Sequence, residues 1–258
     1  TWIGAYTVIL LVGSVAFGRR WFAQADPFEV FSSFVARLSP FGRRSDGVLV
    51  VRNPLANLDG LPSGPGVVAV VAVLFGSTGF DSFSESPFWT TYSQALADDG
   101  VLLDTAVLAL FVLVVGGSFA LATMVVGGLG HIERRLLPQT FAHSVVPIIV
   151  GYFVAHYLTL FVETGQQAVA QLSDPLGTGA NLLGTADMGV SYYLTLHPTG
   201  LAVTKVSAVV LGHLLGAVAA HDRAVRVLPR GREMLGQLPL LLVMVFYTSG
   251  GLYLLLSS

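Results

Sequence analysis

The placement of arginine along the chain is the sequence feature that most constrains its fold. All twelve arginines fall into three clusters, and each cluster follows a long apolar run. The loops that alternate with these clusters carry Asp and Glu but neither Arg nor Lys. Basic loops stay on the cytoplasmic side of a membrane and so set the orientation of a multi-pass protein. The alternation therefore predicts that the clusters face the cytoplasm. They occupy residues 19–52, 134–135 and 223–232.

The composition agrees with a membrane protein. The chain is 53% hydrophobic and 11% charged, whereas a typical soluble domain is about 25% charged. Its apolar residues form runs of roughly 18–25 residues, the length needed to cross about 30 Å of hydrocarbon. The absence of cysteine excludes disulfides and thiolate metal sites. With a net charge of only -2, we expect the lipid bilayer as partner, with other membrane subunits as further candidates and no nucleic acid.

These patterns predict an all-α polytopic transmembrane helix bundle of about six spans in the cytoplasmic (inner) membrane, formed by residues 1–258 as one membrane-embedded domain. The chain begins without Met and enters an apolar run at once, so we expect it to be the C-terminal part of a longer protein. The longest connections are a cytoplasmic loop, 19–64, and an outer loop, 165–198. The spans are expected at residues 2–18, 65–80, 101–126, 139–164, 199–220 and 235–256.

The cytoplasmic loop contains a second helical signal. Asp26, Pro27 and Glu29 suit the N-cap, first and third positions of a helix. Apolar residues then recur at helical spacing up to Leu38. We therefore predict an amphipathic helix over residues 27–38 that lies in the inner interface. It should turn three aromatic rings to lipid or to the underside of the bundle, namely Phe28, Phe31 and Phe34. A short strand-like piece is expected at residues 48–51, between turn-forming residues.

The fourth span carries a stripe of polar side chains. Tyr152, His156, Thr159 and Glu163 are four, three and four residues apart, so they share one face of a helix. An ionisable group in the middle of a span costs ~2.5–3.5 kcal/mol and usually has a task or a partner. We therefore expect this face to point into the bundle.

The fifth span carries Lys205 and His213, and it should run antiparallel to the fourth span. Counting from the ends of the two spans puts His156 level with Lys205, and His143 level with His213. A buried ammonium group needs a carboxylate or another strong acceptor, unless it snorkels to the interface. The candidate carboxylates are Glu163, Asp81 and Glu85. We therefore predict an intramembrane polar site between the fourth and fifth spans, formed by His156, Glu163, Lys205, His213, His143, Tyr152 and Asp81.

Three chemistries remain open for such a site. A single haem between His143 and His213 is one, although a two-haem arrangement would need a second His where Lys205 stands. A metal ion held by His156, Glu163 and an outer-loop Asp is another, with ligand types that suit zinc or copper. The third is a proton- or ion-coupled pathway, because chains of His and carboxylates form proton relays in membranes. No motif identifies catalytic residues. Nearby, Gly212 and Gly216 form a GxxxG pair that predicts a close helix contact.

Several stretches resemble a family of polytopic membrane proteins, common in high-GC actinobacteria, many of which are labelled fenitrothion hydrolase. The stretches are residues 25–30 (ADPFEV), 38–44 (LSPFGRR), 75–83 (FGSTGFDSF) and 219–224 (AAHDRA). The resemblance extends over most of the chain and implies the same class of protein. Family members are longer at the N-terminus, and the label implies organophosphate hydrolysis. The resemblance carries no catalytic residue onto this sequence.

Three functional hypotheses follow. The chain is a transport, translocating or complex-forming subunit that uses the polar site, a membrane-embedded metal-dependent hydrolase, or a structural accessory subunit of a larger membrane complex. A carboxylate and two histidines converging at ~2.0–2.2 Å from a metal would favour the hydrolase. A water-filled cavity in the middle of the membrane without a metal would favour the first hypothesis, and a solid interior would favour the third.

Overall fold

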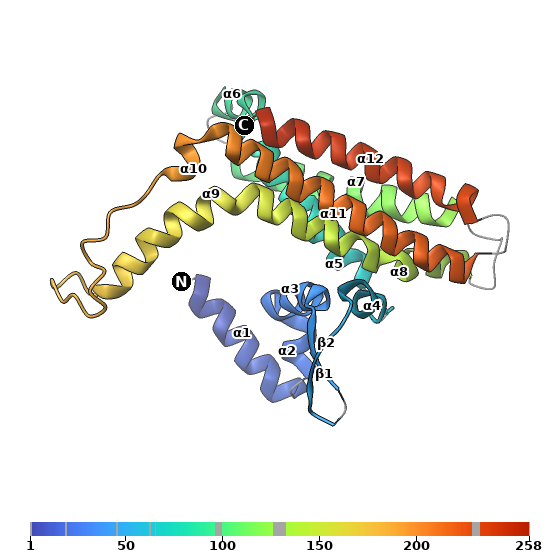
Figure 1. Cartoon of the computed structure of the whole chain (residues 1–258), viewed down its shortest axis with the longest axis horizontal. Helices are drawn as coiled ribbons and strands as arrows, with labels where there is room; N and C mark the ends of the chain where they lie inside the picture. The colour runs from blue at the N-terminus through green and yellow to red at the C-terminus, as the bar shows by residue number, and fades with distance from the viewer. Residues whose placement is uncertain are drawn as a thin grey trace.

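The computed structural model describes residues 2–18, 20–44, 46–61, 63–64, 66–95, 100–125, 133–228 and 233–257. Within these residues, five helices are long and apolar enough to cross a membrane. They lie side by side as one elongated bundle (Figure 1). The prediction of an all-α helical bundle is therefore confirmed. The five helices are α5 (Val67–Ser84), α7 (Gly100–Val125), α9 (Val146–Ser173), α11 (Pro198–Val227) and α12 (Glu233–Ser257).

Shorter elements join the long helices. Among the described residues, the arginines of the second and third clusters gather at one end of the bundle, here called the arginine end. Helix α9 continues nine residues beyond its predicted end at residue 164, so part of the predicted outer loop is helical. The connecting elements are α6 (Pro87–Ala95), η2 (Arg134–Leu136), α8 (Leu137–Phe141), η3 (Ala142–Val145) and α10 (Tyr193–Leu196).

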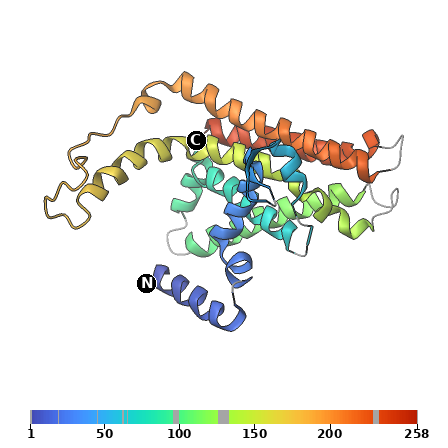
Figure 2. The same ribbon diagram turned by 60° about the horizontal axis from the view of Figure 1, so that its bottom comes forward.

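The first predicted span forms α1 (Trp2–Phe17), a helix of 16 residues that is shorter than the other five. It lies apart from the bundle in both views (Figures 1 and 2). It packs against the next helix, α2 (Arg20–Ala25), and its Tyr6 ring meets Phe28 of α3 (Pro27–Val35) edge to face. The Tyr6 hydroxyl donates to Asp26 at 2.7 Å, and the Trp21 ring covers Gly13. That α1 crosses a membrane stays a prediction.

The predicted capping of the helix in the connecting segment is confirmed. The Asp26 carboxylate accepts a hydrogen bond from the Phe28 amide, and Pro27 is the first residue of α3. The helix ends in a short 3-10 turn, η1 (Ala36–Leu38). Phe34 is buried, and the Phe31 ring contacts Phe153 of α9 at 5.1 Å between centroids. Because Phe153 lies seven residues after the start of α9, α3 packs on the flank of the bundle and not beneath it.

A small hairpin and one more helix complete this segment. Strands β1 (Phe41–Arg43) and β2 (Leu49–Val51) pair antiparallel, with Gly42 opposite Val50. The strand expected at residues 48–51 is thus present as β2. Helix α4 (Pro54–Asp59) is capped by Asn53, whose side chain accepts a hydrogen bond from the Leu55 amide. Leu58 of α4 is fully buried in the core at the arginine end.

Helices α9 and α11 make the closest contact in the bundle. A Cβ atom placed on Gly212 would lie 2.6 Å from the Pro147 carbonyl oxygen, and one on Gly216 would lie 2.7 Å from that of Ser144. A Cβ on Gly151 would lie 2.4 Å from the Ala208 carbonyl oxygen. Glycine is required at these positions because the two backbones touch. The GxxxG pair therefore marks a close helix contact, as predicted.

This contact also sets the relative depth of residues on α9 and α11. With Gly151 opposite Ala208, Lys205 lies within two residues of the level of His156, as the sequence predicts. With Ser144 opposite Gly216, His143 lies one helical turn from the level of His213. The expectation that these two histidines are level is therefore wrong by one turn, because the contact between the helices is shifted relative to their ends.

Candidate functional site

The polar residues of α9 meet α5 in the half of the bundle away from the arginine end. The Tyr152 hydroxyl donates to Ser82 Oγ at 2.7 Å, and Ser82 Oγ lies 3.0 Å from His156 Nδ1. Because the Ser82 hydroxyl accepts a hydrogen bond from Tyr152, it can donate its own hydrogen bond to His156 Nδ1. The neutral imidazole then carries its proton on Nε2. Ser82 is fully buried, and Tyr152 is only 3% exposed.

A second link connects the same two helices. The Tyr157 hydroxyl donates to Asp81 Oδ2. The rings of His156 and Tyr157 meet edge to face with centroids 4.6 Å apart, and the Tyr152 and His156 rings are stacked at 6.2 Å. Five side chains thus form one connected group, which we call the α5–α9 polar cluster: Asp81, Ser82, Tyr152, His156 and Tyr157.

Two further charged residues lie around this cluster. Glu85 is the C-cap residue of α5, one turn beyond Asp81, and Lys205 is on α11. Both are near enough to His156 to act on it electrostatically. Lys205 is partly buried. It forms neither a hydrogen bond nor a salt bridge with any residue that the structure describes. The direct bond expected between Lys205 and His156 or Glu163 is therefore not present, and a contact through one water stays a prediction.

Glu163 lies outside the polar cluster. Its Oε1 accepts a hydrogen bond of 2.6 Å from the Thr195 hydroxyl of α10. It stands seven residues beyond His156 on α9, about two helical turns, and it ties α10 to α9. In the described parts of the chain, no group of three or more His, Asp or Glu side chains is placed to hold a metal ion. The two candidate metal ligands, His156 and Glu163, are thus not brought together.

The two remaining histidines of the predicted site lie toward the arginine end. His213 Nδ1 donates to the Val209 carbonyl oxygen at 2.9 Å, and its buried Nε2 has no hydrogen-bond partner among the residues that the structure describes. His143 Nδ1 lies 3.1 Å from the Thr140 carbonyl oxygen. Between these residues, α9 and α11 touch backbone to backbone at Gly212. This leaves no width for a porphyrin between the helices, so the geometry opposes the haem hypothesis.

A second polar group lies at the arginine end, and we call it the Asp59 cluster. The Asp59 carboxylate of α4 forms ion pairs with Arg223 at 2.9 Å and with Arg226 at 2.6 Å. His143 Nε2 lies 3.9 Å from the same carboxylate. The Asp59 side chain is 25% exposed. Burial acts to raise the pKa of Asp59, but the Arg226 hydrogen bond and the two guanidinium charges outweigh it and hold the pKa below its usual value. The cluster ties α4 to the end of α11.

Sequence reasoning missed Ser82, Tyr157 and Asp59. Ser82 lies just past the predicted end of the second span, and Tyr157 is one residue off the predicted polar stripe. Tyr157 could have been found from the length of its side chain. The hydroxyl of a tyrosine lies far from the backbone, so the residue can join a polar group without being on the polar stripe itself. Asp59 has a weaker signal as a carboxylate within an arginine-rich loop.

The five long apolar helices and the alternating loop charges define a multi-pass helical membrane protein. Comparisons with protein-family models, with curated proteins and with solved structures find no match. The resemblance to proteins labelled fenitrothion hydrolase therefore stays a prediction.

Proposed function

We propose that the chain is a translocating subunit of the cytoplasmic membrane, and that its α5–α9 polar cluster takes up and releases a proton. The observation that carries this proposal is the hydrogen-bonded series Tyr152–Ser82–His156 inside the helix bundle. Polar and ionisable groups at such positions are costly and usually mark a pathway for protons or ions. Asp81, which accepts a hydrogen bond from Tyr157, adds a carboxylate to the same cluster.

The cluster is chemically suited to proton exchange. In the observed geometry the Ser82 hydroxyl can donate a hydrogen bond to His156 Nδ1. A proton arriving at Nδ1 would turn Ser82 from a donor to an acceptor, which a freely rotating hydroxyl allows. The series then has two hydrogen-bonded states that differ by one proton.

The metal-dependent hydrolase is less well supported. It rests on the family resemblance, and the described residues hold no cluster of metal ligands. A structural accessory subunit would not need a connected series of hydroxyl and imidazole groups between two spans. The translocation hypothesis is therefore the one that the geometry favours.

Proton flux into vesicles tests the proposal. The protein would be reconstituted into phosphatidylcholine–phosphatidylglycerol vesicles that contain a pH-sensitive dye, and a potassium diffusion potential would drive proton entry. We expect His156→Gln and Asp81→Asn each to lower the flux at least ten-fold. His197→Gln and Asp187→Asn are matched controls, because both residues are exposed, and their flux should equal that of the wild type. Wild-type flux no greater than that of empty vesicles, or unchanged flux in His156→Gln, would contradict the proposal.

A further inference from the structure

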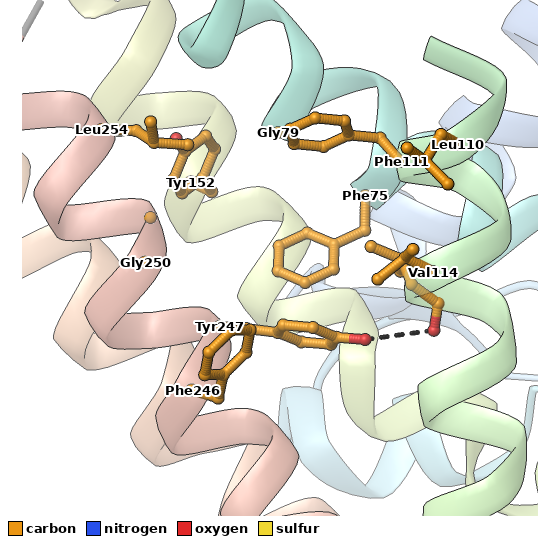
Figure 3. A pocket seen from close by; sticks show the side chains of 12 residues that line it. Phe75, Gly79, Leu110, Phe111, Val114, Tyr152, Phe246, Tyr247, Gly250 and Leu254 are labelled. Carbon is orange, nitrogen blue, oxygen red and sulfur yellow. Dashed lines mark hydrogen bonds between the residues drawn. The ribbon is translucent and has the colours of Figure 1, made fainter. Parts of the chain in front are cut away.

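A cavity of about 280 Å³ lies between α5, α7, α9 and α12 (Figure 3). It is separate from the polar side of α9, although Tyr152 borders both. Its floor is formed by the buried rings of Phe75 and Tyr152, which are 8% and 3% exposed. The larger side chains around it are Phe75, Leu110, Phe111, Tyr152, Phe246 and Tyr247.

The hydroxyl groups of the two tyrosines that line the cavity already have hydrogen-bond partners. The Tyr247 hydroxyl hydrogen-bonds to Ser118 Oγ. It also donates to the Val115 carbonyl oxygen at 3.1 Å, the bond drawn as a dashed line in Figure 3. The Tyr152 hydroxyl donates to Ser82. Both residues therefore offer ring surface to an occupant. Burying an unpaired polar group costs several kcal/mol, so the chemistry of the wall selects a hydrocarbon.

The cavity opens sideways, between α7 and α12. Leu110 and Val114 of α7 are 56% and 52% exposed, and Phe246 of α12 is 71% exposed. Both helices are long and apolar enough to be membrane spans. In a bilayer, exposed apolar side chains on spans face lipid chains. An occupant would thus enter from the bilayer and not from water.

Two glycines of α12 make room for the occupant. A Cβ on Gly250 would meet nothing within 4 Å, whereas one on Gly251 would lie 2.8 Å from the Tyr152 ring. The space beside Gly250 is therefore open, and Gly251 lets α12 approach Tyr152 closely. The volume is near the lower bound of ordinary ligand pockets, ~300 Å³. It fits part of one hydrocarbon chain and not a whole lipid.

We propose that this cavity binds one acyl chain of a bilayer phospholipid, which enters between α7 and α12 and rests on the rings of Phe75 and Tyr152. The inference does not depend on proton translocation. It does place a lipid chain against the residue whose hydroxyl begins the Tyr152–Ser82–His156 series.

Photolabelling from the lipid tests the proposal. The protein would be placed in nanodiscs of phosphatidylcholine that carries a diazirine in the middle of one acyl chain, irradiated, digested and mapped by mass spectrometry. We expect label to concentrate in residues 110–115 and 246–254. The yield should be several-fold higher than in residues 203–214 of α11, which also expose apolar side chains.

A blocking variant and a matched control make the result specific. Gly250→Leu should fill the open space without a clash and lower the labelling of both segments at least five-fold. Gly165→Leu is the control, because a Cβ there also meets nothing within 4 Å. Gly165 is on α9 but well beyond Tyr152, and it does not line the cavity. Should Gly250→Leu fail to fold, Leu110→Phe narrows the mouth instead.

Three results would overturn the proposal. The first is label spread evenly over α7, α11 and α12. The second is unchanged labelling in a folded Gly250→Leu or Leu110→Phe variant. The third is chemical crosslinking of two copies through residues 246–254 without lipid label, which would assign the cavity to a second copy of this chain.

Discussion

The α5–α9 polar cluster and the Asp59 cluster both give polar side chains hydrogen-bond partners, but they use different groups to do so. Inside the bundle, Ser82 and His156 are satisfied by hydroxyl and imidazole groups, with one carboxylate, Asp81, held by a tyrosine. At the arginine end, one carboxylate, Asp59, binds two guanidinium groups. Charge is costly in the middle of a membrane, whereas groups at the end of a bundle can stay partly hydrated. The burial of Ser82 and Tyr152, and the partial exposure of the Asp59 side chain, thus account for the difference in chemistry.

The two clusters also join different kinds of structural element. The α5–α9 polar cluster links two long helices that already pack through apolar side chains. The Asp59 cluster links α4, a helix of six residues, to the end of α11. Between them along α9 lies the close glycine contact with α11.

The largest effect is expected at Gly212. A leucine there would drive a side chain into the Pro147 carbonyl oxygen and Gly151, and neither backbone can yield. Overpacking of this kind costs about 1–3 kcal/mol or more, and we expect Gly212→Leu to reach at least 3 kcal/mol because backbone atoms are involved. Unfolding by SDS in mixed micelles measures this loss. Gly165→Leu, with open space around it, should unfold like the wild type. Equal stability of the two variants would show that α9 and α11 do not touch at Gly212.

The next largest effect is expected at Asp59. Removing one partner of a buried ion pair costs ~3–5 kcal/mol, but Arg226 is about half exposed, so solvent screening lowers the value to about 2 kcal/mol. Asp59→Asn should also release α4 and expose residues 20–61 to protease. Asp46→Asn, which removes an exposed pair with Arg44 at 3.7 Å, should change stability by less than ~1 kcal/mol.

The Asp59 effect should depend on pH with a defined sign. The pKa of Asp59 is lowered in the folded state, so its stabilisation is present above the unfolded value, ~3.9, and is lost as the pH falls through the folded pKa. The stability difference between wild type and Asp59→Asn should be equal at pH 5 and pH 8 and shrink below about pH 4. A difference that grows on acidification would contradict this assignment.

The sequence predicted the long helices well because length and hydropathy alone determine a membrane span. It also predicted the close contact at Gly212 and Gly216, since paired small residues have few other uses in a span. It could not predict which neighbour the polar face of α9 meets. Helical spacing puts Tyr152 and His156 on one face, but the rotation of α9 relative to α5 and α11 depends on packing across the whole bundle. The Asp59–Arg223 contact joins residues 164 positions apart, and no local pattern encodes it.

A moderate effect is expected at Ser82. Ser82→Ala would leave the Tyr152 hydroxyl and His156 Nδ1 without their partner in a buried place. An unsatisfied buried group costs about 1–3 kcal/mol, and we expect a total near 2 kcal/mol, at or just below that of Asp59→Asn. Ser33→Ala is the control, because the Ser33 hydroxyl bonds only within its own exposed turn. Protease digestion distinguishes the two variants further. Ser82→Ala should leave residues 20–61 protected, unlike Asp59→Asn. Cleavage there as rapid as in Asp59→Asn would show that the clusters are not independent.

The smallest effect is expected at Lys205, the one lysine of the chain. It has neither a hydrogen bond nor a salt bridge within the described residues, and it is partly exposed. It stands seven residues after the start of α11 at Pro198, about 10 Å along the helix, so its ammonium can reach the interface along its apolar stem. Lys205→Met should therefore change the free energy of unfolding by no more than ~0.5 kcal/mol, the range for residues without special contacts. A loss of 3 kcal/mol or more would reveal a buried partner reached through water. Combining Lys205→Met with Glu163→Gln or Asp81→Asn in a double-mutant cycle would then identify that partner, because only residues that interact give a non-additive loss.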